Sequence, residues 1–213
     1  MSPSTKAISG LYAVTPDLAD TALLLAKAQA ALAGGVRLMQ YRNKTADDKL
    51  RREQAFALKR LCENHGAALI VNDDVALARE ITADGVHVGA DDATVADARD
   101  LLGDSKIIGA SCYNDLRSAR SAAAQGADYV AFGSFFASAV KPGAVRAPLA
   151  LLQQARQWGR LPVVAIGGIT LANADGLIRA GADAVAVISA LFEAPDIEAA
   201  ARGFCHLFEV NTA

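Results

Sequence analysis

Residues 161–189, LPVVAIGGITLANADGLIRAGADAVAVIS, decide the fold of this chain. Two apolar runs of strand length, at 162–167 and 184–189, stand at the two ends of this stretch. Neither run alternates apolar with polar residues, which is typical of strands buried on both faces of a parallel sheet. The residues between them, 171–180, have a helical pattern and stop at Gly181, a residue that often ends helices. The stretch therefore predicts a strand–helix–strand unit.

The same unit recurs along the whole sequence. Strands are predicted at 11–15, 36–42, 68–73, 85–89, 106–111, 129–135, 162–167 and 184–189, and helices at 20–33, 46–64, 75–81, 94–102, 115–125, 147–158, 171–180 and 196–209. The dipeptide Ala-Asp precedes three of the strands, at Asp84, Asp128 and Asp183, which indicates a repeating unit. Eight units in 213 residues average about 27 residues each, and this predicts a closed (β/α)8 TIM barrel.

An open, doubly wound sheet is the alternative fold. Such a sheet normally shows a glycine-rich fingerprint after its first strand, but Thr15-Pro16-Asp17 stands there. No linker rich in Pro, Gly or Ser interrupts the chain. We therefore predict one domain over residues 1–213, with about residues 1–9 as an N-terminal extension.

Composition limits the classes of function. Hydrophobic residues make up 53% of the 213 residues, so the chain can bury a large core. The net charge of −2 gives no basic excess for nucleic-acid binding. No apolar run is long enough to cross a membrane, and no signal peptide is visible. Cys62, Cys112 and Cys205 lack metal-binding or disulfide spacing, so a cytoplasmic protein is expected.

Polar residues gather where the predicted strands end, which is where barrel enzymes carry their active sites. Gln40, Arg42 and Lys44 form a row of hydrogen-bond donors after the second strand. With Lys141 and Ser138, from a loop after the sixth strand, they suit a polyanion such as pyrophosphate. The loop 137–147 is also a candidate lid.

Glycines follow the seventh strand. Gly167 and Gly168, together with Ile188 and Ser189, are interpreted as a phosphate cradle, because loops seven and eight are the usual phosphate site of barrel enzymes. The alternative is that the two glycines serve only a tight turn.

Two carboxylates follow neighbouring strands. Asp73 and Asp92 have the character of a Mg²⁺ site, because Mg²⁺ takes one or two carboxylates and leaves its other positions to water and phosphates. The alternative is helix capping, by Asp73 or Asp74 before 75–81 and by Asp91 or Asp92 before 94–102. Spacing alone does not separate these two interpretations. His87 lies inside a strand and is expected to be buried and hydrogen-bonded rather than catalytic.

The chain resembles the thiamine phosphate synthase family in a series of short motifs. In chain order these are Leu11-Tyr12-Ala13-Val14-Thr15, Gln40-Tyr41-Arg42-Asn43-Lys44, Val71-Asn72-Asp73, Gly85-Val86-His87-Val88-Gly89 with Asp92, Gly109-Ala110-Ser111, Gly133 to Lys141, Ala165-Ile166-Gly167-Gly168-Ile169 and Val187-Ile188-Ser189-Ala190. Each motif is weak alone, but the ordered set covers nearly the whole chain. The resemblance implies a (β/α)8 barrel and a cytoplasmic transferase of thiamine biosynthesis.

The family joins 4-amino-5-hydroxymethyl-2-methylpyrimidine pyrophosphate to 4-methyl-5-(2-phosphoethyl)thiazole and releases pyrophosphate. The resemblance implies that these small molecules are the partners; whether the chain forms a homo-oligomer stays open. The implied substrate-binding residues are Gln40, Arg42, Lys44, Asn72, Ser111, Ser138, Lys141, Gly168, Ile188 and Ser189. Among them Arg42, Lys44, Ser111 and Lys141 have the implied catalytic role of stabilising the leaving group. Asp73 and Asp92 are the implied Mg²⁺ ligands.

Three positions depart from the family pattern: Asp74, Ala90 and Val140. Val140 cannot donate a hydrogen bond, which leaves one contact to the thiazole phosphate open. A thiazole tautomerase of the same superfamily is the nearest alternative. That enzyme uses a histidine two residues after the serine of the fifth strand, and here the position is Tyr113. A non-catalytic sensor of phosphate ligands on the same barrel is the alternative from another class.

Overall fold

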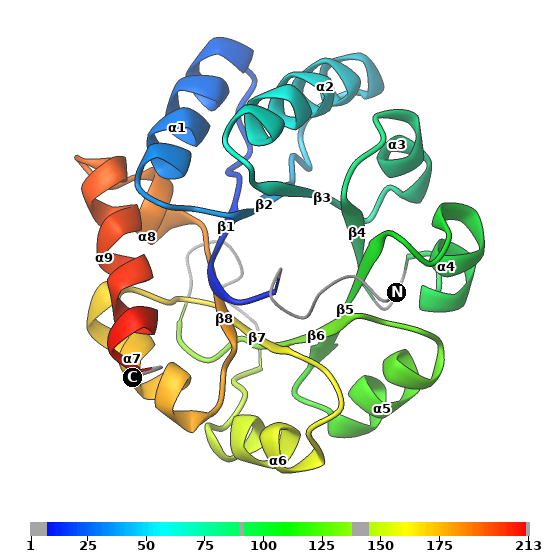
Figure 1. Ribbon diagram of the computed structural model, residues 1–213, viewed down its shortest axis with the longest axis vertical. Helices are drawn as coiled ribbons and strands as arrows, with labels where there is room; N and C mark the ends of the chain where they lie inside the picture. Colours follow the sequence, from blue (N-terminus) through cyan, green and yellow to red (C-terminus); the bar gives the residue numbers. More distant parts are fainter. Residues whose placement is uncertain (1–7, 90–91, 138–144, 212–213) are drawn as a thin grey trace.

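The computed structural model describes residues 8–89, 92–137 and 145–211. Eight parallel strands form a closed barrel in the order of the sequence, and helices surround it (Figure 1). The strands are β1 (Gly10–Val14), β2 (Leu38–Tyr41), β3 (Ala68–Asn72), β4 (Gly85–Val88), β5 (Ile107–Tyr113), β6 (Tyr129–Phe132), β7 (Val163–Ile166) and β8 (Ala184–Val187). The predicted (β/α)8 barrel is confirmed.

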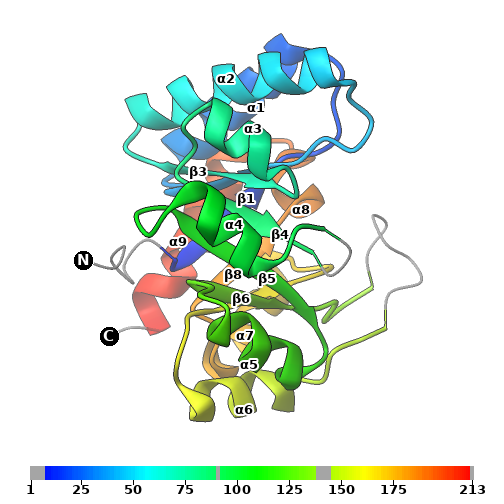
Figure 2. The same cartoon turned by 90° about the vertical axis from the view of Figure 1, so that its right-hand side faces the viewer.

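The helices alternate with the strands along the chain. They are α1 (Thr21–Ala33), α2 (Asp48–Asn64), α3 (Val75–Glu80), α4 (Val95–Leu102), α5 (Leu116–Ala124), α6 (Ala150–Trp158), α7 (Leu171–Ala180), α8 (Ser189–Phe192) and α9 (Ile197–Asn211). The last helix, α9, packs between α1 and α7 and completes the outer ring (Figure 1). Seen from the side, the strands run through the middle of the molecule (Figure 2).

Element boundaries differ from the predictions at a few places. The sixth strand was predicted to reach residue 135, but it ends at Phe132, because Phe135 N donates to the Ile166 carbonyl outside the ladder. The helix predicted from residue 147 begins at Ala150, just after Pro148, since a proline disfavours helical backbone in the residue before it. Helix α8 was not predicted, because four residues are too few to show a helical period.

The strands are buried on both faces, as their continuous apolar character predicted. One cluster fills the barrel interior and includes Tyr12, Leu38, Ile70 and Val164. The larger cluster lies between the barrel and the helices. Because side chains alternate between these two environments along each strand, both layers exclude water from the strand backbone. Ile8 precedes β1 and belongs to the interior cluster, at the N-terminal end of the barrel.

Three aspartates form repeated clamps at the N-terminal ends of the strands. Asp84 accepts a hydrogen bond from Leu69 N, at 2.8 Å, across the gap between β4 and β3. Asp128 does the same with Ile108 N, and Asp183 with Val163 N, each at 2.7 Å. These are the aspartates of the recurring Ala-Asp dipeptide, which the sequence predicted only as the mark of a repeating unit. The structure shows that each carboxylate also joins its strand to the preceding one.

We expect Asp128→Ala to lower the free energy of unfolding by about 2–4 kcal/mol, since it leaves the backbone N–H of Ile108 without its acceptor and removes the carboxylate partner of the half-buried Arg99. Urea denaturation followed by circular dichroism measures this change. Glu198→Ala, which removes only an exposed ion pair with Arg202, is the control and should cost about 1 kcal/mol or less. Equal losses in the two variants would contradict the clamp.

Candidate active site

A cavity of about 860 Å³ opens at the C-terminal ends of the strands. The predicted site residues that line it are Gln40, Arg42, Lys44, Asn72, Asp73, Asp92, Ser111, Gly168, Ile188 and Ser189. The structure therefore brings together residues from six different strand ends. Ser138 and Lys141, and with them Val140 and Ala90, lie outside the described residues.

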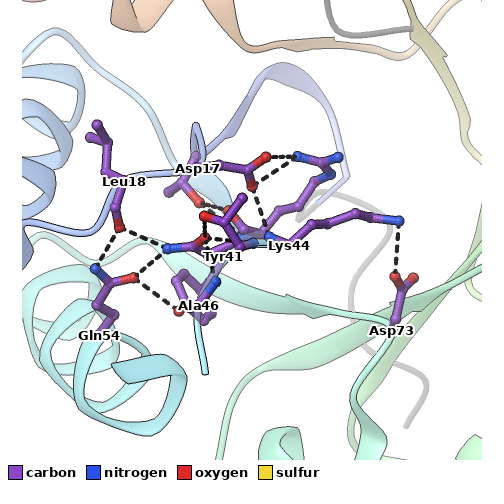
Figure 3. A network of polar contacts seen from close by, with 11 residues as sticks. Asp17, Leu18, Tyr41, Lys44, Ala46, Gln54 and Asp73 are labelled. Carbon is purple, nitrogen blue, oxygen red and sulfur yellow. Dashed lines mark hydrogen bonds and ion pairs between the residues drawn. The ribbon is translucent and has the colours of Figure 1, made fainter. Parts of the chain in front are cut away.

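Arg42 and Lys44 are held by the loop that follows β1. Asp17 Oδ1 lies 3.2 Å from Arg42 Nη1 and also accepts a hydrogen bond from Lys44 N, at 2.8 Å (Figure 3). Thr15 exchanges two hydrogen bonds with the backbone of Arg42, at 2.8 and 2.9 Å. The sequence predicts no such role for Thr15, the end of the first predicted strand, or for Asp17, and the two served there as evidence against a glycine-rich fingerprint. Their contacts span 25 or more residues, so local spacing gave no signal for them.

A buried amide side chain on α2 joins the loop after β1 to the loop after β2. Gln54, fully buried on α2, accepts hydrogen bonds from Tyr41 and Asn43, both at 3.0 Å, and donates to the Leu18 carbonyl at 2.9 Å (Figure 3). Asn43 donates to the same carbonyl at 2.7 Å. The loops after β1 and β2 are therefore joined through helix α2, and this fixes where Arg42 projects.

Asp73 and Asp92 lie together at the ends of β3 and β4. Burial, and then the neighbouring carboxyl of Asp92, raise the pKa of Asp73, while Lys44 opposes the shift with its Nζ 3.8 Å from Asp73 Oδ2 (Figure 3). Asp92 accepts a hydrogen bond from Gly89 N at 2.9 Å. Two carboxylates that share so small a space favour either a shared proton or a cation between them.

The capping interpretation is wrong for both of these residues. Asp74 is the N-cap of α3 and accepts from Leu77 N at 2.8 Å, whereas Thr94 is the N-cap of α4. Asp73 stands before the cap with a left-handed backbone, at φ 64°. Within the described residues, no group of three or more His, Cys, Asp or Glu side chains lies together as a metal site.

Across the cavity, the chain after β7 turns on two glycines. Gly167 and Gly168 have φ angles of 104° and 64°, which residues with side chains rarely adopt. A Cβ at Gly168 would also collide with the carbonyl oxygen of Ala137. The turn itself therefore requires glycine, and the same glycines leave this wall of the cavity as bare backbone. Ser189, the first residue of α8, lines the cavity beside them.

The floor of the cavity is a neutral polar cluster. His87 is buried, with Nδ1 2.9 Å from the Tyr129 hydroxyl and Nε2 2.9 Å from Ser111 Oγ. Burial lowers its pKa to about 4, so the imidazole is neutral at physiological pH. The expectation of a buried, hydrogen-bonded His87 is confirmed. Tyr12, which lines the cavity, and Tyr129, which lies behind it against His87, were missed as site residues. The Tyr129 ring fills the space that a Cβ at Gly109 would need.

Comparison with known sequences places the chain in a family. A sequence model of the family described as Thiamine monophosphate synthase matches residues 11–191. The chain belongs to the thiamine monophosphate synthase family. Thiamine-phosphate synthase of Methylobacillus flagellatus is 58% identical over 94% of this chain and 96% of the relative. That of Thioalkalivibrio sulfidiphilus is 54% identical over 99% of this chain and 100% of the relative.

A solved structure supports the same family. Thiamine phosphate pyrophosphorylase from Pyrococcus furiosus superposes with a TM-score of 0.87 at 32% identity, over 99% of this chain and 100% of that one. The expectations of a thiamine phosphate synthase, a transferase of thiamine biosynthesis, are therefore confirmed. A 3-hexulose-6-phosphate synthase, at 21% identity, 92% and 99% coverage and a TM-score of 0.68, shares the fold. None of the helices that the structure describes is both long and apolar enough for a membrane crossing.

The neutral state of His87 predicts a pH dependence of stability. Its folded pKa of about 4 lies below the ordinary 6.5, so its contribution is complete above pH 6.5 and is lost as the pH falls toward 4. We expect the free energy of unfolding of the wild type to fall relative to that of His87→Gln over this interval, by a few kcal/mol at most. Denaturation curves at pH 7, 5.5 and 4 measure it. A constant difference between the two proteins would contradict a depressed pKa.

Proposed function

We propose that this cavity makes thiamine phosphate by joining the pyrimidine pyrophosphate to the thiazole phosphate. The bond between the pyrimidine methylene carbon and the pyrophosphate oxygen breaks, and its electron pair leaves with pyrophosphate. The thiazole nitrogen then forms the new bond to that carbon with its lone pair. The observation that carries the proposal is a single cavity whose one side holds Arg42, Lys44 and a carboxylate pair, while its other side is the glycine turn after β7.

The leaving pyrophosphate is assigned to the ends of β2 and β3. Arg42 and Lys44 supply fixed positive charge, and Gln40 and Asn72 add polar contacts from the same wall. Ionisation of the carbon–oxygen bond moves charge onto the pyrophosphate, so donors placed beforehand stabilise the transition state more than the ground state. Asp17 acts through Arg42: its carboxylate holds the guanidinium at the cavity wall.

Asp73 and Asp92 fit a Mg²⁺ ion. The raised pKa of Asp73 shows that its charged form is disfavoured by its surroundings, which is the situation that a divalent cation relieves. When bound, Mg²⁺ would neutralise part of the pyrophosphate charge. Two carboxylate ligands leave the remaining coordination positions to water and phosphate oxygens. We assign the ion to this pair on the chemistry of the two side chains.

The thiazole phosphate is assigned to the opposite wall. Gly168, Ile188 and Ser189 line it, and the first N–H groups of α8 have no partner within their helix. A phosphate anchored there would hold the thiazole nitrogen close to the pyrimidine carbon, so that attack becomes effectively unimolecular. The neutral floor of the cavity offers no charged base, and the reaction needs none.

Several parts of the assignment stay predictions. Ser138 and Lys141 are assigned to the anionic groups on sequence alone, and the single domain stays a prediction. The three free thiols, two of them buried, support a reducing cytoplasm as the place of the reaction.

A product assay tests the proposed function. Purified protein is mixed with the pyrimidine pyrophosphate, the thiazole phosphate and Mg²⁺, and thiamine phosphate is measured by thiochrome fluorescence. We expect product that disappears when EDTA is added and returns with excess Mg²⁺. Absence of product from folded protein would overturn the proposal and would favour the tautomerase or the sensor.

Asp92→Asn tests the cation site, because an asparagine oxygen can keep the hydrogen bond from Gly89 N while the charge is lost. We expect kcat to fall at least about a hundredfold and the Mg²⁺ requirement to shift to higher concentration, with KM for the thiazole phosphate nearly unchanged. Initial rates over a Mg²⁺ series measure both effects. The same Mg²⁺ dependence in wild type and variant would contradict the assignment.

Arg42→Ala tests the pyrophosphate wall. Loss of a charge-assisted hydrogen bond should raise KM for the pyrimidine pyrophosphate by about tenfold to a hundredfold, while KM for the thiazole phosphate stays close to that of the wild type. Arg52→Ala is the matched control, since Arg52 pairs with Glu80 on the outer face of the barrel. An unchanged KM for the pyrophosphate substrate in Arg42→Ala would exclude this role.

A further inference from the structure

Five side chains form one continuous hydrogen-bonded chain across the floor of the cavity. Gln40 Nε2 lies 2.9 Å from the Tyr12 hydroxyl, which lies 2.9 Å from the hydroxyl of Tyr129. Tyr129 reaches His87 Nδ1 at 2.9 Å, and His87 Nε2 reaches Ser111 Oγ at 2.9 Å. The five residues come from β2, β1, β6, β4 and β5, so the chain, which we call the floor relay, joins strands that are far apart in sequence.

The floor relay has a direction, which follows from counting protons. An amide nitrogen can only donate, so the Tyr12 oxygen accepts from Gln40. Among the described residues Tyr129 is the one other partner of the buried Tyr12 hydroxyl, so the Tyr12 hydrogen is satisfied when it points to Tyr129. The Tyr129 hydroxyl, having accepted this bond, donates to His87 Nδ1. His87 then carries its one ring proton on Nε2 and donates to Ser111 Oγ. The hydroxyl hydrogen of Ser111 is left to point elsewhere, and Ser111 lines the cavity.

Burial keeps every member of the floor relay neutral. Tyr12, Tyr129, Gln40 and His87 are all nearly inaccessible to water, and burial disfavours the charged forms of the two tyrosines and of the imidazole. Within the described part of the chain, no buried side-chain nitrogen or oxygen lacks a hydrogen-bond partner. Because each link carries one proton, the direction set at Gln40 is transmitted to Ser111.

The His87 ring is also fixed in place. It stacks on Tyr129 with ring centroids 5.5 Å apart and an angle of 22° between the planes, while Tyr12 meets Tyr129 edge to face. The Tyr129 ring occupies the space above Gly109, where any side chain would collide with it. Packing therefore holds the rings in the geometry that the hydrogen bonds require.

We propose that the floor relay locks His87 as the neutral Nε2–H tautomer and thereby makes the Ser111 hydroxyl a hydrogen-bond donor to the leaving pyrophosphate. Tyr12, Tyr129 and His87 are positioning residues that act through Ser111. The role of Ser111 rests on the proposed function, but the tautomer of His87 does not.

Nitrogen-15 NMR of the histidine rings tests the tautomer directly. In protein labelled at histidine and held at pH 7.5 without substrate, we expect one ring with a protonated Nε2 and an unprotonated Nδ1. His87→Gln, which removes one of the three histidines, assigns the signal. A His87 ring protonated at Nδ1, or at both nitrogens, would overturn the proposal. The tautomer itself is read from the wild-type spectrum. If His87→Gln does not fold, sequential resonance assignment identifies the His87 signal instead.

Tyr129→Phe tests whether the relay sets the tautomer and the activity. The variant keeps the ring over Gly109 but removes the donor to His87, so we expect the Nε2–H preference to weaken and kcat to fall about tenfold, with KM for the thiazole phosphate unchanged. Tyr41→Phe is the matched control for the spectrum, since it removes another buried hydroxyl, bonded to Gln54 outside the relay. It should leave the His87 signals as in the wild type.

The outcomes separate this inference from the proposed function. An unchanged His87 spectrum in Tyr129→Phe, or an unchanged kcat, would refute the relay as a positioning device. If Tyr129→Phe does not fold, Tyr12→Phe breaks the relay one link earlier and is judged by the same two results. The expected tautomer in a protein that forms no thiamine phosphate would refute the function and leave the tautomer assignment standing.

Discussion

The backbone N–H groups that donate from one strand to Asp84, Asp128 and Asp183 at the start of the next fix the register on which the rest of the barrel depends. Side chains alternate between the interior and the helix layer along every strand, so a slip of one residue would exchange the two. The clamps act at the N-terminal ends, and the site lies at the opposite ends. Charged residues needed for stability and charged residues needed for chemistry are thereby kept at different ends of the same strands.

Register also explains how a site assembles from residues far apart in sequence. Each parallel strand delivers its last side chains to one rim, so Arg42, Asp73 and Asp92 meet although 50 residues separate the first from the last. The charged side chains lie at this rim, whereas the polar side chains at the floor of the cavity are neutral. A neutral, buried floor strengthens the electrostatic effect of the rim residues on a bound anion, because little water remains to screen them.

Much of this could be predicted from the sequence, and the reasons are local. Continuous apolar runs separated by helical patterns predicted the barrel, and the rule that barrel sites lie at strand ends selected the lining residues. The contacts of Asp17, Tyr12 and Tyr129 could not be predicted, because their partners are 25 to 117 residues away and no period connects them. That neither Asp73 nor Asp92 caps a helix also needed coordinates, since only the structure shows that Asp74 and Thr94 are the N-caps of α3 and α4.

The most direct test of the whole account is the location of a cation and an anion in a crystal. Crystals soaked with Mn²⁺, which scatters anomalously, and inorganic pyrophosphate would show where each one binds. We expect an anomalous peak between the carboxylates of Asp73 and Asp92, with pyrophosphate against Arg42 and Lys44. A peak elsewhere in the cavity, or pyrophosphate seated on Gly168 and Ser189 with the carboxylate pair empty, would contradict the division of the cavity into two walls.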